Sequence, residues 1–318
     1  MPLDPKRANL LARANRAFGE RPVAEVLVKV RAIIGPPHIP DSEKAAQDAW
    51  DKLQAGAEDP TPQELAALEL VIRLMRPAPL SINGRLADIP DQPGHNLFPP
   101  EMKDRWSAFR EKVQPLLYSI GRIDTKAGVL VGTGFVVAAG LLATNRHVLG
   151  ALTYGAEVLA PGQARVTFQH EFGAVNSPAH IAEIQGVAAI HPTLDMVLLR
   201  IPADARPAVG IEPASVAPEH AIVAIGYPAR DPSRNPLFLD AIYQNKYEVK
   251  RAALGEVLDG TLAPVLFHDA STTGGNSGSP LFSMASGRVA GIHRAGFFMY
   301  RNEGVDADRL REFIAASI

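Results

Sequence analysis

From residue 116 onward, the chain consists of short apolar runs separated by Gly, Pro, Asn and Asp. Many short runs with regular turn signals are typical of an all-β barrel or sandwich. The clearest runs lie at residues 129–138, 164–168, 196–201, 221–226 and 289–292. This pattern predicts a mainly β domain.

The last residues follow a helical pattern instead. Leu310, Phe313 and Ile314 recur at spacings of three and four residues. Either Asp306 or Asp308 can cap the N-terminus of such a helix. We therefore expect the β domain to be closed by a C-terminal helix whose apolar side packs on it.

Apolar residues in the first third of the chain also recur at helical spacing. They predict three helices between residues 4 and 56. A fourth helix begins at a capping box formed by Thr61 and Glu64, with Pro62 at the first helical position. Four short helices predict a small α-helical bundle over about residues 4–76.

Six prolines then fall between Pro77 and Pro100. Such a stretch is typical of a linker or of an extended strap over a neighbouring surface. A connecting helix is predicted from about residue 101 to 113, with Trp106 and Phe109 as its anchors. The expected organisation is a helical module at 1–76, a linker with a connecting helix at 77–112, and the β domain at 113–318.

The candidate chemistry centres on Ser277, which stands in Gly275-Asn276-Ser277-Gly278. Glycines permit the tight turn that presents a nucleophilic hydroxyl. A histidine and an aspartate that such a serine requires occur upstream as His147 and Asp195, at separations of 48 (195 − 147) and 82 (277 − 195) residues. The order His, Asp, Ser is that of the chymotrypsin arrangement.

Each of these residues alone has a plainer interpretation. Gly-x-Ser-Gly is common in turns, His147 has the apolar neighbours of a packed histidine, and Asp195 could lie at a strand edge. All three in one order, each in an apolar context, favour a catalytic triad.

The sequence has no motif for α/β-hydrolase, dinucleotide-binding, metal or nucleotide chemistry. Ser279 stands where the second glycine of an α/β-hydrolase elbow belongs, and Val137 stands where a dinucleotide fingerprint needs its third glycine. No His-Glu-x-x-His, P-loop or paired-cysteine motif occurs. We therefore expect no metal and no cofactor.

The same segments carry a family resemblance. Residues 132–136 (Gly-Thr-Gly-Phe-Val), 144–147 (Thr-Asn-Arg-His), 191–195 (His-Pro-x-x-Asp) and 272–280 resemble the trypsin-like peptidases. Residues 271–280 and 289–293 look most like the bacterial V8-like glutamyl endopeptidase branch. The resemblance covers about residues 116–318. It implies two antiparallel six-stranded β-barrels with the active site between them and a C-terminal helix.

The resemblance also implies roles for individual residues. Ser277 would be the nucleophile, His147 its general base and Asp195 the group that orients the imidazole. The backbone N–H groups of Gly275 and Ser277 would form the oxyanion hole. The expected activity is serine endopeptidase action on a protein or peptide substrate.

A specificity pocket can be carried over in the same way. Thr272 and His293 match the pair that binds an acidic P1 side chain in glutamyl endopeptidases, and we expect cleavage after Glu or Asp. The chain departs from that branch at Arg294, which could either supply positive charge or point to solvent. The plainer alternative for His293 is a buried strand end that satisfies a backbone group.

Composition limits the remaining functions. A formal net charge of −2 gives no electrostatic case for nucleic-acid binding, and no run approaches the ~20 apolar residues of a membrane span. The chain has no cysteine, and no signal-peptide core follows its first residues, so we expect a cytoplasmic protein.

The helical module at 1–76 has no specific motif. It loosely resembles adaptor domains fused to enzymes in bacterial defence and signalling systems. We expect it either to bind a regulatory protein partner or to brace the barrel. The alternative for the whole chain is a catalytically silent protease-fold scaffold in such a bacterial complex.

Overall fold

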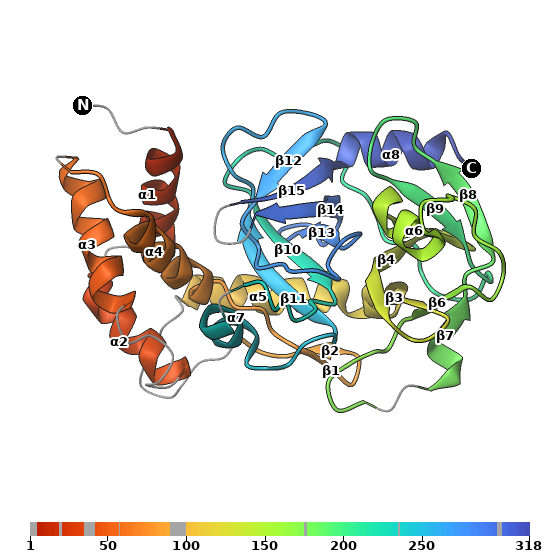
Figure 1. The fold of residues 1–318 in the computed structure, drawn as a ribbon, viewed down its shortest axis with the longest axis horizontal. Helices are drawn as coiled ribbons and strands as arrows, with labels where there is room; N and C mark the ends of the chain where they lie inside the picture. Colours follow the sequence, from red (N-terminus) through yellow and green to blue (C-terminus); the bar gives the residue numbers. More distant parts are fainter. Residues whose placement is uncertain are drawn as a thin grey trace.

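The computed structural model describes residues 5–18, 21–34, 42–56, 58–89, 100–174, 177–234, 236–297 and 301–318. Four N-terminal helices lie beside two curled β-sheets, and the sheet made of later strands is the one next to them (Figure 1). The fold is chymotrypsin-like, as the sequence predicts.

The helical region consists of four helices that follow the predicted pattern. They are α1 (Pro5–Phe18), α2 (Val23–Ile34), α3 (Ser42–Ala55) and α4 (Pro62–Leu74). The predicted capping box is present: the Glu64 N–H donates to Thr61 Oγ1 at 3.2 Å, and the Thr61 N–H donates to Glu64 Oε2 at 2.7 Å. Every residue of α4 from Ala67 to Leu74 is buried, so α4 is the central helix of this region.

The first sheet has the strand order β7-β6-β3-β4-β5-β9-β8. Its strands are β3 (Ile120–Thr125), β4 (Leu130–Ala138), β5 (Leu141–Thr144), β6 (Ala164–Thr167), β7 (Ile181–Glu183), β8 (Gly186–Ile190) and β9 (Val197–Arg200). It counts seven strands where six were expected. The extra strand arises because residues 181–190 form two strands instead of one. The segment bends at Ile184 and Gln185, so β7 lies at one edge of the curled sheet and β8 at the other.

The second sheet has six strands in the order β11-β10-β13-β14-β15-β12. They are β10 (Ala221–Gly226), β11 (Arg251–Glu256), β12 (Val265–His268), β13 (Pro280–Ser283), β14 (Val289–Phe297) and β15 (Arg301–Asp306). A bridge between Val257 and His268 brings its two outer strands together. Asp306, one of the two predicted caps, accepts a hydrogen bond from the Arg309 N–H and starts α8 (Ala307–Ala315).

Residues 77–81 run antiparallel along the outer edge of β11. The N–H groups of Leu254 and Ala252 donate to the carbonyls of Pro77 and Pro79, and the Ser81 N–H donates to the Lys250 carbonyl. The two-stranded hairpin β1 (Ser81–Ile82) and β2 (Arg85–Leu86) follows. This part of the proline-rich segment is therefore an extended strap, whereas residues 90–99 lie outside the described residues.

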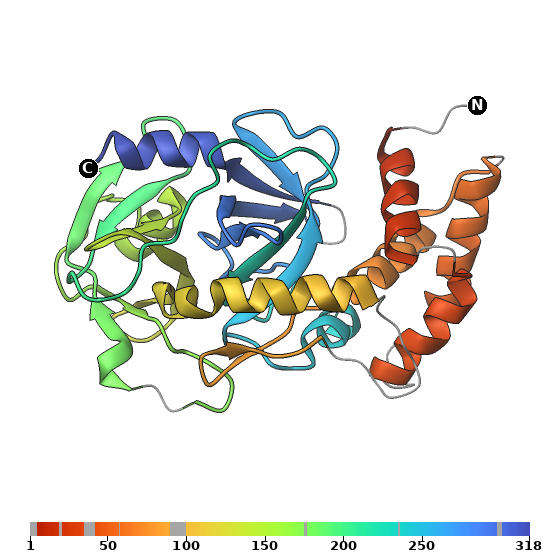
Figure 2. The same ribbon diagram turned by 180° about the vertical axis from the view of Figure 1, so that it is seen from behind.

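Helix α5 (Pro100–Val113) spans the back of the molecule from the helical region to the first sheet (Figure 2). It leads into the 3-10 helix η2 (Gln114–Ser119) and then β3. Trp106 and Phe109, the predicted anchors, are buried on its inner side. Phe109 lies 5.6 Å from Trp106 and 6.3 Å from Phe282 of β13, measured between ring centroids.

Three short helices lie in the connections between strands. They are α6 (Arg146–Thr153), η3 (Pro178–His180) and α7 (Pro236–Tyr243). Helix α6 contacts β4 of the first sheet, and α7 contacts α4 of the helical region.

The apolar core is not divided between the helices and the second sheet. One cluster of buried side chains includes Phe18 of α1, Leu68 of α4, Phe109 of α5 and Phe282 of β13. A separate cluster fills the first sheet. The helical region and the second sheet thus share one core.

A buried lysine joins the ends of the two sheets. Lys250 Nζ donates to the carbonyls of Leu117 at 2.5 Å and Phe168 at 2.7 Å, and it lies 3.9 Å from the Glu171 carboxylate. Burial lowers the pKa of Lys250 to about 7, although the charge of Glu171 opposes this shift. Lys250 directly precedes β11, Phe168 directly follows β6, and Leu117 lies in η2, so these hydrogen bonds hold the second sheet against the first.

We predict that Phe109→Ala destabilises the whole molecule. The phenyl ring is fully buried between α5 and β13, so its removal leaves a cavity and should cost about 3–5 kcal/mol of unfolding free energy. Urea unfolding measures this loss. Arg105→Ala, on the exposed side of the same helix, should change stability by less than about 0.5 kcal/mol. Equal stability of the two variants would contradict the packing.

Candidate active site

Ser277 lies in the tight loop that leads from β12 into β13. Gly275 and Gly278 both adopt positive φ values, +85° and +86°. A Cβ at Gly275 would come within 2.3 Å of the Tyr227 carbonyl oxygen, and one at Gly278 within 2.1 Å of the Thr133 carbonyl oxygen. Only glycine fits both the angle and the space, so the glycines next to Ser277 are required by its loop.

Strand β4 of the first sheet holds this loop. The Thr133 N–H donates to the Ser277 carbonyl, and the Thr133 hydroxyl donates to the Gly275 carbonyl, both at 2.8 Å. A Cβ at Gly132 would lie 3.0 Å from the Ser277 oxygen and 2.7 Å from Val148. The Gly-Thr-Gly motif thus lets the serine loop approach closely to the segment that follows His147.

His147 and Asp195 are joined by two hydrogen bonds. His147 stands in the first turn of α6, directly after β5, and Asp195 stands just before β9. The imidazole Nδ1 is 2.7 Å from Asp195 Oδ2, and the His147 backbone N–H donates to Asp195 Oδ1 at 3.0 Å. Asn145 Nδ2 donates to the Asp195 carbonyl at 2.9 Å and fixes the loop from the other side.

The environment keeps Asp195 ionised. Partial burial alone would raise the pKa of its carboxyl group. The hydrogen bonds and charge of His147 outweigh this effect, with a smaller contribution from Arg294, and hold the pKa below its ordinary value. A carboxylate in this position stabilises an imidazolium that forms on His147.

The Ser277 side chain faces a cavity of about 210 Å³. The lining comprises Asp231, Arg234, Thr272, Thr273, Gly274, Ser277, His293, Ala295 and Gly296. In the described part of the chain, the Ser277 hydroxyl makes no hydrogen bond, and none therefore joins it to His147. Catalytic hydrogen bonds are often long in unliganded enzymes and tighten when substrate binds.

Two backbone N–H groups of the serine loop have no hydrogen-bond partner in the described part of the chain. Among the residues that the structure describes, none accepts a hydrogen bond from the N–H of Gly275 or of Ser277. The neighbouring N–H groups of Asn276 and Gly278 do have partners, the carbonyls of Thr273 and His293. Two free donors in one tight loop are available to a bound oxyanion.

Two of the three residues expected at the specificity pocket line this cavity. Thr272 Oγ1 is buried and has no hydrogen-bond partner in the described part of the chain. His293 is buried, and its Nδ1 lies 3.0 Å from Nε2 of His268. Burial, together with His268 and His147, lowers the pKa of His293 well below its ordinary value, so this imidazole is neutral.

Arg294 is placed elsewhere. It is absent from the cavity lining, and its Nη2 pairs with Glu303 Oε2 at 2.6 Å. Its neighbours on β14, His293 and Ala295, are the residues that reach the cavity. The charge of Arg294 acts on Asp195.

The family of the chain follows from a comparison with known sequence families. A family model described as trypsin-like peptidase domain matches residues 132–292, which is just over half of the chain. The chain belongs to this family of trypsin-like peptidases. The match spans the glycines of β4, His147, Asp195, Ser277 and most of the second sheet.

Two solved structures align with about two thirds of the chain. The serine endoprotease from Yersinia pestis aligns with a TM-score of 0.49 and 18% identity, over 66% of this chain and 66% of its own length. The chain thus spans slightly less than two thirds of that structure. Rv3671c from M. tuberculosis, in an inactive serine-to-alanine form, aligns with a TM-score of 0.45 and 17% identity, over 65% of this chain and 89% of its own. No curated protein sequence gives a significant match.

Asp231 and Arg234 are lining residues of the trypsin-like domain that the sequence analysis did not single out. They lie in the loop between β10 and α7, and Arg234 Nε donates to Asp231 Oδ2 at 3.1 Å. Only the Asp-Pro-Ser turn of this loop is visible in the sequence, and such a turn carries no sign of a pocket.

The described residues of the trypsin-like peptidase contain no group of three or more His, Cys, Asp or Glu side chains that could hold a metal ion. None of their helices combines the length and apolar character needed to cross a membrane.

We predict that Gly275→Ala slows peptide cleavage by at least about a hundredfold, because a methyl group at positive φ forces the loop away from Tyr227 and moves the two free N–H donors. Initial-rate measurements on a peptide substrate test this. Gly210→Ala is the matched control, since Gly210 is not part of the cavity lining and a Cβ there meets only the Arg288 side chain, at an ordinary 3.5 Å. Similar losses in both variants would contradict the assignment.

Proposed function

We propose that this chain is a serine endopeptidase that cleaves peptide bonds through an acyl-enzyme on Ser277. One observation carries the proposal: His147 is fixed by two hydrogen bonds to Asp195, and Ser277 lines a cavity in a loop with two unpaired N–H donors. These are the parts that acyl transfer needs.

In the proposed mechanism, His147 takes the proton of the Ser277 hydroxyl as its oxygen attacks the substrate carbonyl. Asp195, which stays ionised, stabilises the resulting imidazolium and keeps the ring oriented. The N–H groups of Gly275 and Ser277 donate to the oxyanion. His147 then returns the proton to the leaving amine, and water releases the acyl group by the same steps.

We propose that residues 113–318 are the peptidase unit and that residues 1–76 form a helical module joined through residues 77–112. The strap along β11 and the shared core support close association of the module with the second sheet. Binding of a regulatory protein through residues 1–76 is a further proposal, which rests on the loose resemblance of this module to adaptor domains fused to enzymes.

For substrate choice we propose an acidic P1 residue, Glu or Asp, bound by Thr272 and His293. The likeness of residues 271–280 to glutamyl endopeptidases supports this, as does the unpartnered Thr272 hydroxyl. If His268 Nε2 donates to His293 Nδ1, the other ring nitrogen of His293 carries a proton for the P1 oxygen. Arg294 would reach the carboxylate only by leaving Glu303, so the pocket is assigned without it.

We predict that a fluorophosphonate probe labels the full-length protein and that Ser277→Ala abolishes labelling while the circular-dichroism spectrum is unchanged. Ser279→Ala is the matched control, because Ser279 is a buried serine of the same loop. It should label normally. Labelling that persists in Ser277→Ala, or full-length protein that stays unlabelled, would count against the proposed activity.

We also predict a pH effect on P1 choice. A P1 carboxylate next to His293 raises the pKa of this neutral imidazole, so binding of a Glu substrate takes up a proton and strengthens as the pH falls. The kcat/KM ratio of P1-Glu to P1-Gln peptides should therefore rise from pH 8 to pH 6, by at most about tenfold per pH unit. His147 affects both substrates equally and cancels.

His293→Gln should flatten this ratio, since the variant has no group that takes up a proton. A peptide library in which Lys, Arg or Leu is preferred at P1 would refute the acidic pocket.

A further inference from the structure

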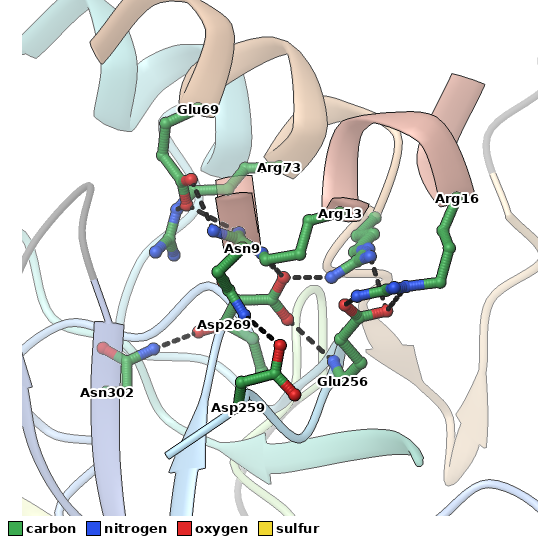
Figure 3. Close-up of polar contacts among 11 residues, drawn as sticks. Asn9, Arg13, Arg16, Glu69, Arg73, Glu256, Asp259, Asp269 and Asn302 are labelled. Atoms are coloured by element: carbon green, nitrogen blue, oxygen red, sulfur yellow. Dashed lines mark hydrogen bonds and ion pairs between the residues drawn. The ribbon is translucent and has the colours of Figure 1, made fainter. Parts of the chain in front are cut away.

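The helical region meets the second sheet through a cluster of buried charges. Arginines come from the helical side and acids from both sides (Figure 3). The members with mostly buried side chains are Arg13, Glu69, Arg73, Arg76, Glu256 and Asp269. Such groups are costly to bury unless they are paired with good geometry, so the cluster requires both sides to be in place.

Arg13 is the bridge in this cluster. Its Nη1 and Nη2 donate to the two carboxylate oxygens of Glu69 at 2.8 and 2.9 Å, which holds α1 on α4. Its Nε donates to Asp269 Oδ2 at 2.8 Å. One planar guanidinium thus joins two helices of the module to the second sheet, a geometry that lysine cannot reproduce.

Asp269 is fully buried and is held on both oxygens. Its Oδ1 accepts the Glu256 N–H at 2.7 Å, and its Oδ2 accepts from Arg13 and from Arg76. Burial would raise the pKa of Asp269, but Arg76 and Arg13 outweigh it and keep the carboxyl ionised. The charge of this carboxylate is therefore compensated mainly from the helical module.

The segment that starts at Asp269 forms the wall of the substrate cavity. Ala270 packs on β11 so closely that a Cβ at Gly255 would lie 2.4 Å from its backbone nitrogen. The Ala270 carbonyl accepts a hydrogen bond from Asn302 Nδ2 at 2.5 Å. Thr272, two residues further on, lines the cavity.

A second segment of the cavity lining, which includes His293 and Gly296, is linked to this wall through Asn302 and His268. A Cβ at Gly296 would lie 2.5 Å from Asn302 Oδ1, so Asn302 contacts both the Ala270 carbonyl and a lining residue of the cavity. His268, the residue before Asp269, contacts His293 of the lining at 3.0 Å. A displacement of Asp269 would therefore move Thr272, Asn302 and the histidine pair together.

We propose that the helical module is a structural part of the substrate pocket, and that Arg13 is a positioning residue that holds the 268–272 wall through Asp269. The proposal rests on the function proposed above, because it assigns this cavity to the substrate's P1 side chain. It differs from a detachable regulatory arm: separation of the module would leave Asp269 and Glu256 without the cations that compensate them.

The test compares two arginines on one helix. Arg13→Ala removes the bridge to Asp269. Arg16→Ala removes a pair with Glu256 and Glu219 from the next turn of α1 but does not touch Asp269. Arg13→Lys keeps the charge and is expected to fall between wild type and Arg13→Ala. If Arg13→Ala does not fold, Arg13→Lys can be compared with wild type instead, and the same changes are expected at a smaller size.

The first readout is kinetic, per active site titrated with fluorophosphonate. In Arg13→Ala we expect KM for a P1-Glu peptide to rise about tenfold or more, as the misplaced wall loses its contacts. The labelling rate by a small fluorophosphonate that lacks a P1 side chain should change less than twofold. If Arg13 only stabilised the fold, KM for the P1-Glu peptide would not change independently of the labelling rate. Arg16→Ala should leave both the KM and the labelling rate near the wild-type values.

The second readout does not depend on activity. Hydrogen exchange of peptides covering residues 268–277 should be faster in Arg13→Ala and unchanged in Arg16→Ala, since a loosened wall opens locally. Equal exchange and equal KM in the two variants would overturn the proposal. If the wild type fails to label, the proposed function fails, and the exchange comparison still decides whether Arg13 holds the wall.

Discussion

The contact between strand β4 and the serine loop is the constraint on which the site depends. Ser277 belongs to the second sheet and His147 to the first, so their approach is fixed where the sheets meet. Thr133 makes that junction with its N–H and its hydroxyl, and its own carbonyl accepts from the Thr144 hydroxyl at 2.7 Å, one strand away. Side chains larger than hydrogen at Gly132 or Gly278 would push the sheets apart. The relative position of Ser277 and His147 is thus a property of backbone packing.

Local signals were sufficient to predict much of the fold. The capping box at Thr61, the Asp306 cap and the short apolar strands have causes within a few residues, so they can be identified in the sequence. Residues 132–136 and the loop around Ser277 were equally visible, because tight turns and close backbone approach demand glycine. The seventh strand escaped because bending of one segment at 184–185 depends on how the sheet closes.

Long-range partners could not be predicted in this way. Arg13 and Asp269 are 256 residues apart, and neither stands in a motif. The strap along β11 and the histidine pair behind the cavity depend equally on the assembled second sheet. Arg294 shows the same limit for a residue that the sequence did suggest. Its place after His293 favours a role in the pocket, but side chains alternate between the two faces of β14, and Arg294 points away from the cavity and pairs with Glu303. Charge and spacing identify candidates, and tertiary contacts decide which of them reach the cavity.

The separation between Arg13 and Asp269 also bears on the order in which the molecule is made. Arg13 of helix α1 leaves the ribosome well before Asp269, which lies 256 residues further along the chain. At roughly 5–20 residues per second, the 256 intervening residues take on the order of 13 to 50 seconds to synthesise. During that interval the arginines of the nascent helices can pair with Glu69 but not yet with Glu256 or Asp269. By the time Asp269 is made, every strand of the first sheet has been synthesised, so the charged face is completed only together with the second sheet.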